Sequence, residues 1–379
     1  MKYMGSKRSM LKNGLGKLLL EESKGRTRVV DLFSGSGSVS WFVSTNVNLP
    51  VFALDLQSYA ATLAAAVIER SSNVNVKSLI DTWLIKSINW AQQHPTWNEV
   101  ISIDSSNSNA FTWSKRSRDF VSSFPINEEH VVTSSYGGHY FSLTQSLLLD
   151  GMLNNLPSKP QQRKLCHAAT IIAASCCSAS PGHTAQPFQP TKTASKYIQE
   201  AWSRDPVHQA KRAIIEMSHL RARKKGKARV GDAMKLVPKL NKEDLVFIDP
   251  PYSDVQYSRF YHVLETIARR KLINVSGVGR YPPFSERPVS QFSRKSESYY
   301  ALQELLQGIA LVGADVILTF PSSTSSNGLS GQIIKQVARK WFSIKKHLIK
   351  TRFSSLGGNN NNRRARIPSE ELILVLKPK

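Results

Sequence analysis

Short apolar runs alternate with longer amphipathic stretches at both ends of the chain. Runs of four to seven mostly apolar residues bounded by Gly, Pro, Asn or Asp predict strands, and alanine-rich or 3.6-periodic stretches predict helices. The predicted strands are 27–33, 50–55, 228–232, 245–248, 315–320, 343–350 and 371–377, and the helices between them are 11–22, 59–70, 78–93, 297–312 and 331–342, with a further helix starting at 39. This alternation predicts an α/β fold with a mostly parallel sheet and an antiparallel C-terminal hairpin.

The middle of the chain has a different character. Polar or proline-rich loops at 105–109 and 180–190 separate stretches at 144–156, 163–177 and 197–223 that predict helices. We therefore predict three regions: one half of the core at 1–100, an inserted, mainly helical recognition region at 101–226, and the second half of the core at 227–379.

The predicted strand 245–248 ends abruptly in Asp249-Pro-Pro-Tyr252. Proline has no backbone donor for a central strand, so we expect a stiff, exposed turn at the carboxyl end of the strand, where open α/β sheets bind ligands. If the ligand is a flipped nucleobase, Asp249 and the Pro250 carbonyl can accept the two hydrogens of its exocyclic amine. Tyr252 would stack on the base, which is worth about 1–3 kcal/mol. The alternative is an ordinary strand end followed by a proline turn.

A glycine turn follows the first predicted strand. The sequence Asp31-Leu-Phe-Ser-Gly-Ser-Gly37 differs from the Gly-x-Gly-x-x-Gly of dinucleotide sites, and its acid suits a ligand that carries an ammonium and a sulfonium. S-adenosylmethionine has both groups. Asp55, which ends the second strand, is a candidate to accept the ribose hydroxyls, or else it caps the following helix.

The tetrapeptide Asp249–Tyr252 resembles the catalytic motif of amino-group methyltransferases that act on adenine, and the order of motifs resembles the Dam-like class of adenine-specific DNA methyltransferases. The resemblance implies a Rossmann-like methyltransferase fold, S-adenosyl-L-methionine as cofactor, and direct methyl transfer to a flipped adenine of double-stranded DNA, without a metal, in restriction-modification or phage defence. It implies catalytic roles for Asp249, Pro250, Pro251 and Tyr252. The implied cofactor residues are Tyr3, Gly5, Lys7, Asp31, Phe33, Ser34, Gly35, Gly37, Asp55, Leu56, Asp232, Ala233 and Asp249, with Asp232 accepting from the amine of the cofactor's adenine.

The chain is strongly cationic. Its 51 Lys and Arg against 27 Asp and Glu give a formal charge of +24, which indicates a polyanionic partner. The predicted nucleic-acid contacts are Arg221, Arg223, Lys224, Lys225, Lys227, Tyr257, Arg259, Arg363, Arg364 and Arg366. We expect the connection 357–366 to be disordered without DNA. Base-reading side chains stay open among Asn107, Asn109, Lys115, Arg116, Arg118, His139 and His183.

Several other functions fit the sequence less well. The three cysteines show no metal-ligand spacing and none follows a proline, which disfavours thiolate attack on a pyrimidine. The absence of a long apolar stretch and of a signal-like amino terminus predicts a cytoplasmic protein with no membrane partner. The alternatives are an RNA or protein amino-group methyltransferase and a non-catalytic DNA-binding or specificity subunit. An endonuclease is disfavoured because no second metal-binding carboxylate accompanies Asp249.

Overall fold

The computed structural model describes residues 7–106, 109–353 and 367–379, without the side chains of 350–353 and 367–369. The chain divides into two compact units. Among the described residues, the sheet unit comprises 7–72, 220–257, 288–353 and 367–379, and the helical unit comprises 73–106, 109–219 and 258–287.

The sheet unit is built on seven strands in the order β3-β2-β1-β4-β5-β7-β6. They are β1 (Arg28–Asp31), β2 (Val51–Asp55), β3 (Lys227–Val230), β4 (Asp244–Ile248), β5 (Asp315–Pro321), β6 (Phe342–Phe353) and β7 (Ile367–Pro378). Strands β1 to β5 are parallel, whereas β7 pairs antiparallel with both β5 and β6. The predicted fold class, a mostly parallel sheet with an antiparallel C-terminal hairpin, is confirmed.

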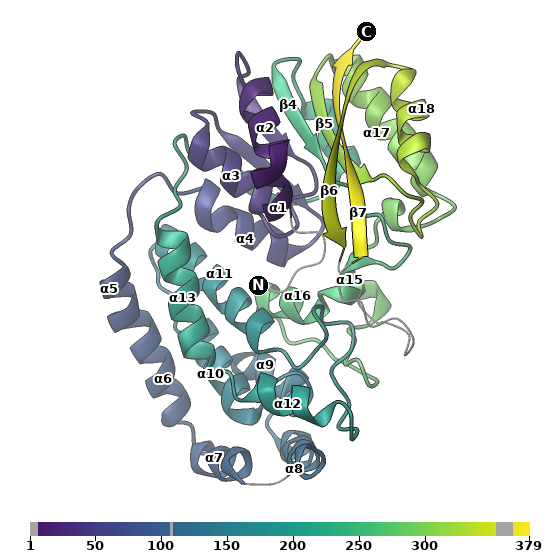
Figure 1. Ribbon diagram of the computed structural model, residues 1–379. Coiled ribbons are helices and arrows are strands. Elements are labelled where there is room, and N and C mark those ends of the chain that lie inside the picture. The colour runs from purple at the N-terminus through teal and green to yellow at the C-terminus, as the bar shows by residue number, and fades with distance from the viewer. Residues whose placement is uncertain (1–6, 107–108, 354–366) are drawn as a thin grey trace. The chain divides into compact units, whose positions relative to one another are not determined.

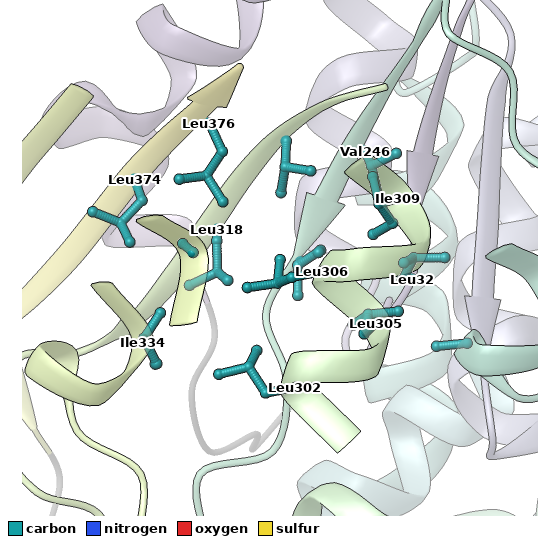
Figure 2. Close-up of a cluster of buried hydrophobic side chains, with 14 of the residues drawn as sticks. Leu32, Val246, Leu302, Leu305, Leu306, Ile309, Leu318, Ile334, Leu374 and Leu376 are labelled. Carbon is teal, nitrogen blue, oxygen red and sulfur yellow. The ribbon is translucent and has the colours of Figure 1, made fainter. Parts of the chain in front are cut away.

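Helices cover both faces of this sheet (Figure 1). On one face lie α1 (Arg8–Met10), α2 (Gly16–Glu22), α3 (Ser38–Asn46) and α4 (Ser58–Ile68), and on the other lie α17 (Ser298–Val312) and α18 (Gly331–Arg339). Figure 2 shows Leu302, Leu306 and Ile309 of α17 packed against strand residues such as Val246 and Leu318, all of them buried. Burial on both faces explains why the central strands are continuous apolar runs.

The order of the strands creates a switch point between β1 and β4. The chain moves outward from β1 through β2 to β3, and from β4 through β5 in the other direction. Open α/β sheets bind ligands outside the carboxyl ends of the strands at such a point. The glycine turn after β1 and the Asp249–Tyr252 turn after β4 both begin there.

The helical unit consists of short helices packed around the buried α10. Its helices are α5 (Val76–Leu79), α6 (Ile85–Gln92), α7 (Trp97–Ser105), α8 (Ala110–Ser123), α9 (Val131–Tyr136), α10 (Leu143–Asn154), α11 (Pro160–Cys177), α12 (Ser195–Trp202), α13 (Pro206–Ser218) and α16 (His262–Arg269), with α15 (Tyr257–Phe260) beginning one residue before the unit. A Cβ added at Gly151 of α10 would lie 2.4 Å from the Ser87 carbonyl oxygen of α6, so glycine permits this close helix crossing. None of the helices among the described residues is long and apolar enough to cross a membrane.

The boundaries of the units differ from the predicted 1–100, 101–226 and 227–379. The helical unit begins at residue 73, because the stretch 76–92 packs on α10 rather than on the sheet. It also includes residues 258–287, which come later in the chain. The predicted helix 197–223 was wrong in extent: it is interrupted before Pro206, whose ring suits a helix start, and it ends at Ser218. The predicted helix 11–22 contains a kink at Gly14, where φ is +120°.

Candidate active site

The Asp249–Tyr252 turn begins directly after the fully buried strand β4. Pro250 is buried, whereas Asp249, Pro251 and Tyr252 are half-buried. The prediction of an exposed turn was therefore wrong in degree, because side chains from other parts of the sheet unit pack over it. The turn is nevertheless not sealed in the core, since the Asp249 side chain keeps 16% of its surface exposed.

A buried lysine lies against the turn. Lys7 Nζ is 3.0 Å from Asp249 Oδ1 and 3.5 Å from Glu371 Oε2, and the Lys7 side chain is only 4% exposed. Burial by itself would lower the pKa of Lys7, but the Asp249 and Glu371 carboxylates outweigh it and raise that pKa above its ordinary value. Lys7 therefore stays charged and presents a fixed cation to one oxygen of Asp249. The family resemblance implies a place for Lys7 beside the cofactor, whereas no pattern in the sequence indicates Glu371.

Two polar side chains that no sequence motif indicates also hold the turn. Thr319 of β5 donates from Oγ1 to Asp249 Oδ1 at 2.8 Å. Asn327 donates from Nδ2 to the carbonyl oxygen of Pro251 at 2.9 Å and to that of Phe292 at 3.0 Å. Thr319 could have been suspected from the sequence, because it is a hydroxyl residue in the apolar run 316–320. It follows Leu318, which pairs with Ile248, so Thr319 lies beside Asp249.

Tyr252 packs edge-on against Phe320, with their ring centroids 6.4 Å apart. Burial raises the pKa of the Tyr252 phenol, and the Lys7 ammonium opposes that rise. The phenol therefore stays neutral at physiological pH, and one edge of the ring is fixed by the core.

Asp31, at the end of β1, is an almost fully buried acid with incomplete hydrogen bonding. Ser40 Oγ donates to its Oδ2 at 2.6 Å, while Oδ1 has no hydrogen-bond partner within the described part of the chain. Burial raises the pKa of the Asp31 carboxyl to about 7, the Ser40 hydrogen bond opposes this rise, and the Asp249 carboxylate adds to it. Such a group is costly for the folded protein unless a cation or donor reaches it.

A small pocket lies at the carboxyl ends of β1, β2 and β3. Four of the predicted cofactor residues line it, namely Phe33, Leu56, Asp232 and Ala233. The remaining lining residues, which no motif indicates, are Leu32, Gly231, Met234 and the segment 289–292. Phe33 and Phe292 meet edge to face across it, with centroids 5.1 Å apart. The pocket is therefore an apolar slot with a carboxylate at one side.

Asp232 and Asp55 both make local hydrogen bonds. Asp232 caps α14 (Ala233–Leu236) by accepting from Met234 N, and it also lines the pocket. Asp55 accepts from Gly35 N at 2.8 Å and from Gln57 N at 3.0 Å, so it ties the end of β2 to the glycine turn. A carboxylate has about four acceptor positions, so Asp232 keeps capacity to accept from a ligand. Gly37 begins α3 at φ +74°, a conformation that favours glycine.

The predicted nucleic-acid contacts are dispersed. The residues Arg221, Arg223, Lys224, Lys225 and Lys227 are exposed, and they lead into the amino end of β3 rather than ending a helix as we predicted. This basic run lies at the amino ends of the parallel strands, whereas the Asp249 turn lies at their carboxyl ends, roughly 17 Å further along the strand direction for a strand of five residues. Arg223 is anchored within the run, because its Nε donates to the Thr45 carbonyl oxygen at 3.1 Å.

The other predicted contacts fall into three groups. Tyr257 is half-buried, and Arg259 is exposed with its guanidinium carbon 5.1 Å from the centre of the Tyr281 ring. Tyr261, four residues after Tyr257, is fully buried and so cannot contact a nucleobase. Tyr3, Gly5, Asn107, Arg363, Arg364 and Arg366, with the connection 357–366, lie outside the described residues.

The sequence also matches a known protein family. A family model described as D12 class N6 adenine-specific DNA methyltransferase matches residues 3–109 and 158–311, which is more than half of the chain. The chain belongs to this family. The matched ranges include the Lys7 segment, the glycine turn and the Asp249–Tyr252 turn.

Two curated relatives resemble parts of the chain. Modification methylase StsI of Streptococcus sanguinis is 24% identical over 311 residues, which cover 82% of this chain and 42% of the relative. Modification methylase LlaI of Lactococcus lactis subsp. lactis is 42% identical over 66 residues, 17% of this chain and 10% of the relative. The chain thus spans less than half of the length of either relative.

Proposed function

We propose that this protein transfers a methyl group from S-adenosyl-L-methionine to the N6 amine of a flipped adenine in double-stranded DNA. One observation carries the proposal: in a chain of this family, the Asp249–Tyr252 turn and the acid of the glycine turn lie side by side at the switch point of the sheet. A target amine at one turn and a methyl donor at the other would meet at this edge.

The residues at the glycine turn fit the cofactor. Asp31 offers an unpaired buried carboxylate oxygen, which suits an ammonium group, and the slot beside Phe33 suits a flat adenine ring. Asp232 can accept from that ring's amine, and Asp55 can accept from ribose hydroxyls. When bound, S-adenosyl-L-methionine supplies the electrophilic methyl on its sulfonium.

The Asp249 turn fits the target base. Lys7 and Thr319 both contact Oδ1 of Asp249, so Oδ2 and the Pro250 carbonyl oxygen would accept the two amine hydrogens. These bonds draw the amine lone pair out of the ring, and Tyr252 stacks on the base. Asp249 or water then takes the surplus proton. Holding the amine in line with the methyl contributes much of the acceleration, since alignment of reactants is worth about 7–11 kcal/mol.

The test is methyl transfer from labelled S-adenosyl-L-methionine to DNA, with the modified nucleoside identified by mass spectrometry. We expect N6-methyladenine from the wild-type chain and at least a hundredfold less from Asp249→Ala, with cofactor affinity retained in calorimetry. Near-normal turnover by Asp249→Ala would refute the role of the turn. Transfer to RNA in place of DNA would favour the RNA methyltransferase, and cofactor binding without transfer to any nucleic acid would favour the specificity subunit.

We further propose that the reaction takes place in the cytoplasm and serves restriction-modification or phage defence, a role supported by the modification methylases that the chain resembles. The basic run 221–227 would contact phosphates at least one strand length from the target base, because it lies at the amino ends of the parallel strands. Tyr257 and Arg259 follow the catalytic turn in the chain, so they would contact DNA near the target. Arg363, Arg364 and Arg366 would contact the DNA backbone or a groove.

A further inference from the structure

Two half-buried arginines of the helical unit converge beside His139. Arg118, on α8, donates from Nε to the Gly138 carbonyl oxygen at 3.0 Å. Arg280, in the turn between Ser276 and Tyr281, donates from Nε to the Ser135 carbonyl oxygen at 2.9 Å and from a terminal nitrogen to that of Ser134 at 3.3 Å. Backbone carbonyls around α9 therefore orient both guanidinium groups.

Within the described chain, neither guanidinium group forms an ion pair with a carboxylate. Burial lowers the pKa of Arg118, and the neighbouring Arg280 lowers it further. Burial lowers the pKa of His139 to about 3, and the positive charges of Arg118 and Arg280 contribute to this fall. His139 is therefore neutral at physiological pH. Two partly desolvated cations without a counter-charge are costly, and an anion bound between them would offset that cost.

The backbone brings the two arginines together by unusual means. Arg280 has φ +51°, a left-handed conformation that is uncommon for residues other than glycine. The turn that carries it is closed by reciprocal hydrogen bonds between the backbones of Ser276 and Tyr281, at 2.9 and 3.0 Å. A Cβ added at Gly138 would lie 2.9 Å from Arg118 N, so glycine permits the approach of α8. Backbone strain of this kind often marks a functional site.

We propose that Arg118 and Arg280 together bind one backbone phosphate of double-stranded DNA. Paired guanidinium forks match the geometry of a phosphate and hold it more specifically than scattered surface lysines do. The site deepens the proposed function, on which it rests for its partner. It gives Arg118 and His139 a positioning role instead of the base-reading role that the sequence leaves open, because phosphate contacts carry no direct sequence information.

The test is binding of a fluorescent DNA duplex of about 30 base pairs to the full chain, measured by anisotropy at several salt concentrations without cofactor. We expect Arg118→Gln and Arg280→Gln each to lower affinity about tenfold, and the double variant to reduce the salt slope by about 0.9, because the phosphate is left without a cation only when both arginines are replaced. Because both residues hold the same phosphate, the double variant should lose less than the product of the single losses. A duplex of unrelated sequence should show the same effects.

Arg212→Gln is the control, since Arg212 is an exposed arginine on α13 of the same unit. Unchanged affinity in both single variants, or an equal loss in Arg212→Gln, would overturn the proposal. If circular dichroism shows that the glutamine variants do not fold, Arg118→Lys and Arg280→Lys provide the test. Both keep the charge but lose the forked guanidinium, so we expect DNA affinity to fall several-fold with an unchanged salt slope. Wild-type affinity in both lysine variants would overturn the site. If the wild-type chain methylates DNA but the arginine variants bind DNA normally, only the phosphate site is refuted. If DNA binding depends on the two arginines but the wild-type chain transfers no methyl group, only the proposed function is refuted.

Discussion

Three acids, Asp31, Asp249 and Glu371, and one lysine, Lys7, set the charge near the carboxyl ends of the parallel strands. Lys7 neutralises part of the field of Asp249 and Glu371, whereas Asp31 has no cation among its described contacts. A buried carboxylate without a counter-charge favours its protonated form. The protein thus holds Asp31 in a state that a cationic ligand would relieve, at some cost to the stability of the unliganded chain.

Asp31→Asn should separate that stability cost from ligand binding. The folded pKa of Asp31 is about 7, above the ordinary value near 3.9, so ionisation of Asp31 reduces stability as pH rises from about 4 to 7 and the full cost is present above pH 7. We expect the variant to be more stable than wild type at pH 8, by roughly 2–4 kcal/mol in unfolding free energy, and to show little difference at pH 4. Its affinity for S-adenosyl-L-methionine should fall at least tenfold. Equal denaturation curves at pH 8 would show that Asp31 is not an uncompensated charge.

Glu371→Gln should weaken methyl transfer without affecting the cofactor. Glu371 shares Lys7 with Asp249, so neutralising Glu371 leaves the lysine charge to Asp249 alone and makes that carboxylate a poorer acceptor for the amine. A hydrogen bond to a charged group is worth about 1.5–3 kcal/mol, which corresponds to a loss of roughly 10–100-fold in kcat.

Glu370→Gln is the control for that experiment, because Glu370 is the exposed neighbour on the same strand. We expect it to leave kcat within twofold of wild type. Cofactor affinity, measured by calorimetry, should be unchanged in both variants. A loss of cofactor affinity that accounts for the whole effect of Glu371→Gln would assign the residue to the cofactor site instead.

At the scale of elements, the strands were predictable and the contacts between them were not. The apolar run 245–248 and its proline stop located β4 and the Asp249–Tyr252 turn, because burial on both faces leaves a pattern in the sequence. Glu371 escaped prediction because it reaches the site only through the antiparallel pairing of Glu371 with Pro321. The sequence reveals a basic run at 221–227 but not its place in the fold, whereas the register of β3 with β2 places it at the amino ends of these strands. Pairing and register are long-range properties that local patterns do not encode.

Asp150 shows how one side chain can order an element of the helical unit. From the buried α10 it accepts hydrogen bonds from Val132 N at 2.7 Å, Thr133 N at 2.9 Å and Thr133 Oγ1 at 2.7 Å, and so it caps α9. Asp150→Ala leaves those donors unpaired in the core, so we expect a loss of about 2–4 kcal/mol in unfolding free energy. Asp150→Asn keeps one acceptor oxygen, so its unfolding free energy should lie between those of the wild type and Asp150→Ala. Chemical denaturation measures both, with the exposed Asp119→Ala as control, and a near-neutral Asp150→Ala would contradict the capping role.

At the scale of the whole molecule, two separate segments of the chain form the helical unit. The residues on either side of each segment belong to the sheet unit or lie beside it, and hydrogen bonds join them. Residues 73–219 leave after Ser72 and return at Leu220, where Arg70 donates to the Leu220 carbonyl oxygen and accepts from Ala222 N at 2.9 Å. Residues 258–287 leave and return beside Gln256 and Ser290, which exchange two hydrogen bonds of 3.0 and 2.8 Å. The ends of both segments are thus held close together by the sheet unit itself.

This arrangement predicts that the sheet unit folds and binds cofactor without the helical unit. A variant in which short Gly-Ser linkers replace both 73–219 and 258–287 retains the lining of the pocket, Asp31 and the Asp249 turn. We expect it to unfold cooperatively and to bind S-adenosyl-L-methionine within about tenfold of the wild-type affinity. It should bind and methylate DNA more weakly than the wild-type chain, since the arginine pair at 118 and 280 would be missing. Asp31→Asn in the same background should abolish cofactor binding, which excludes adventitious association. A variant that is unfolded even with saturating cofactor would show that the helical unit is required to complete the core of the sheet unit.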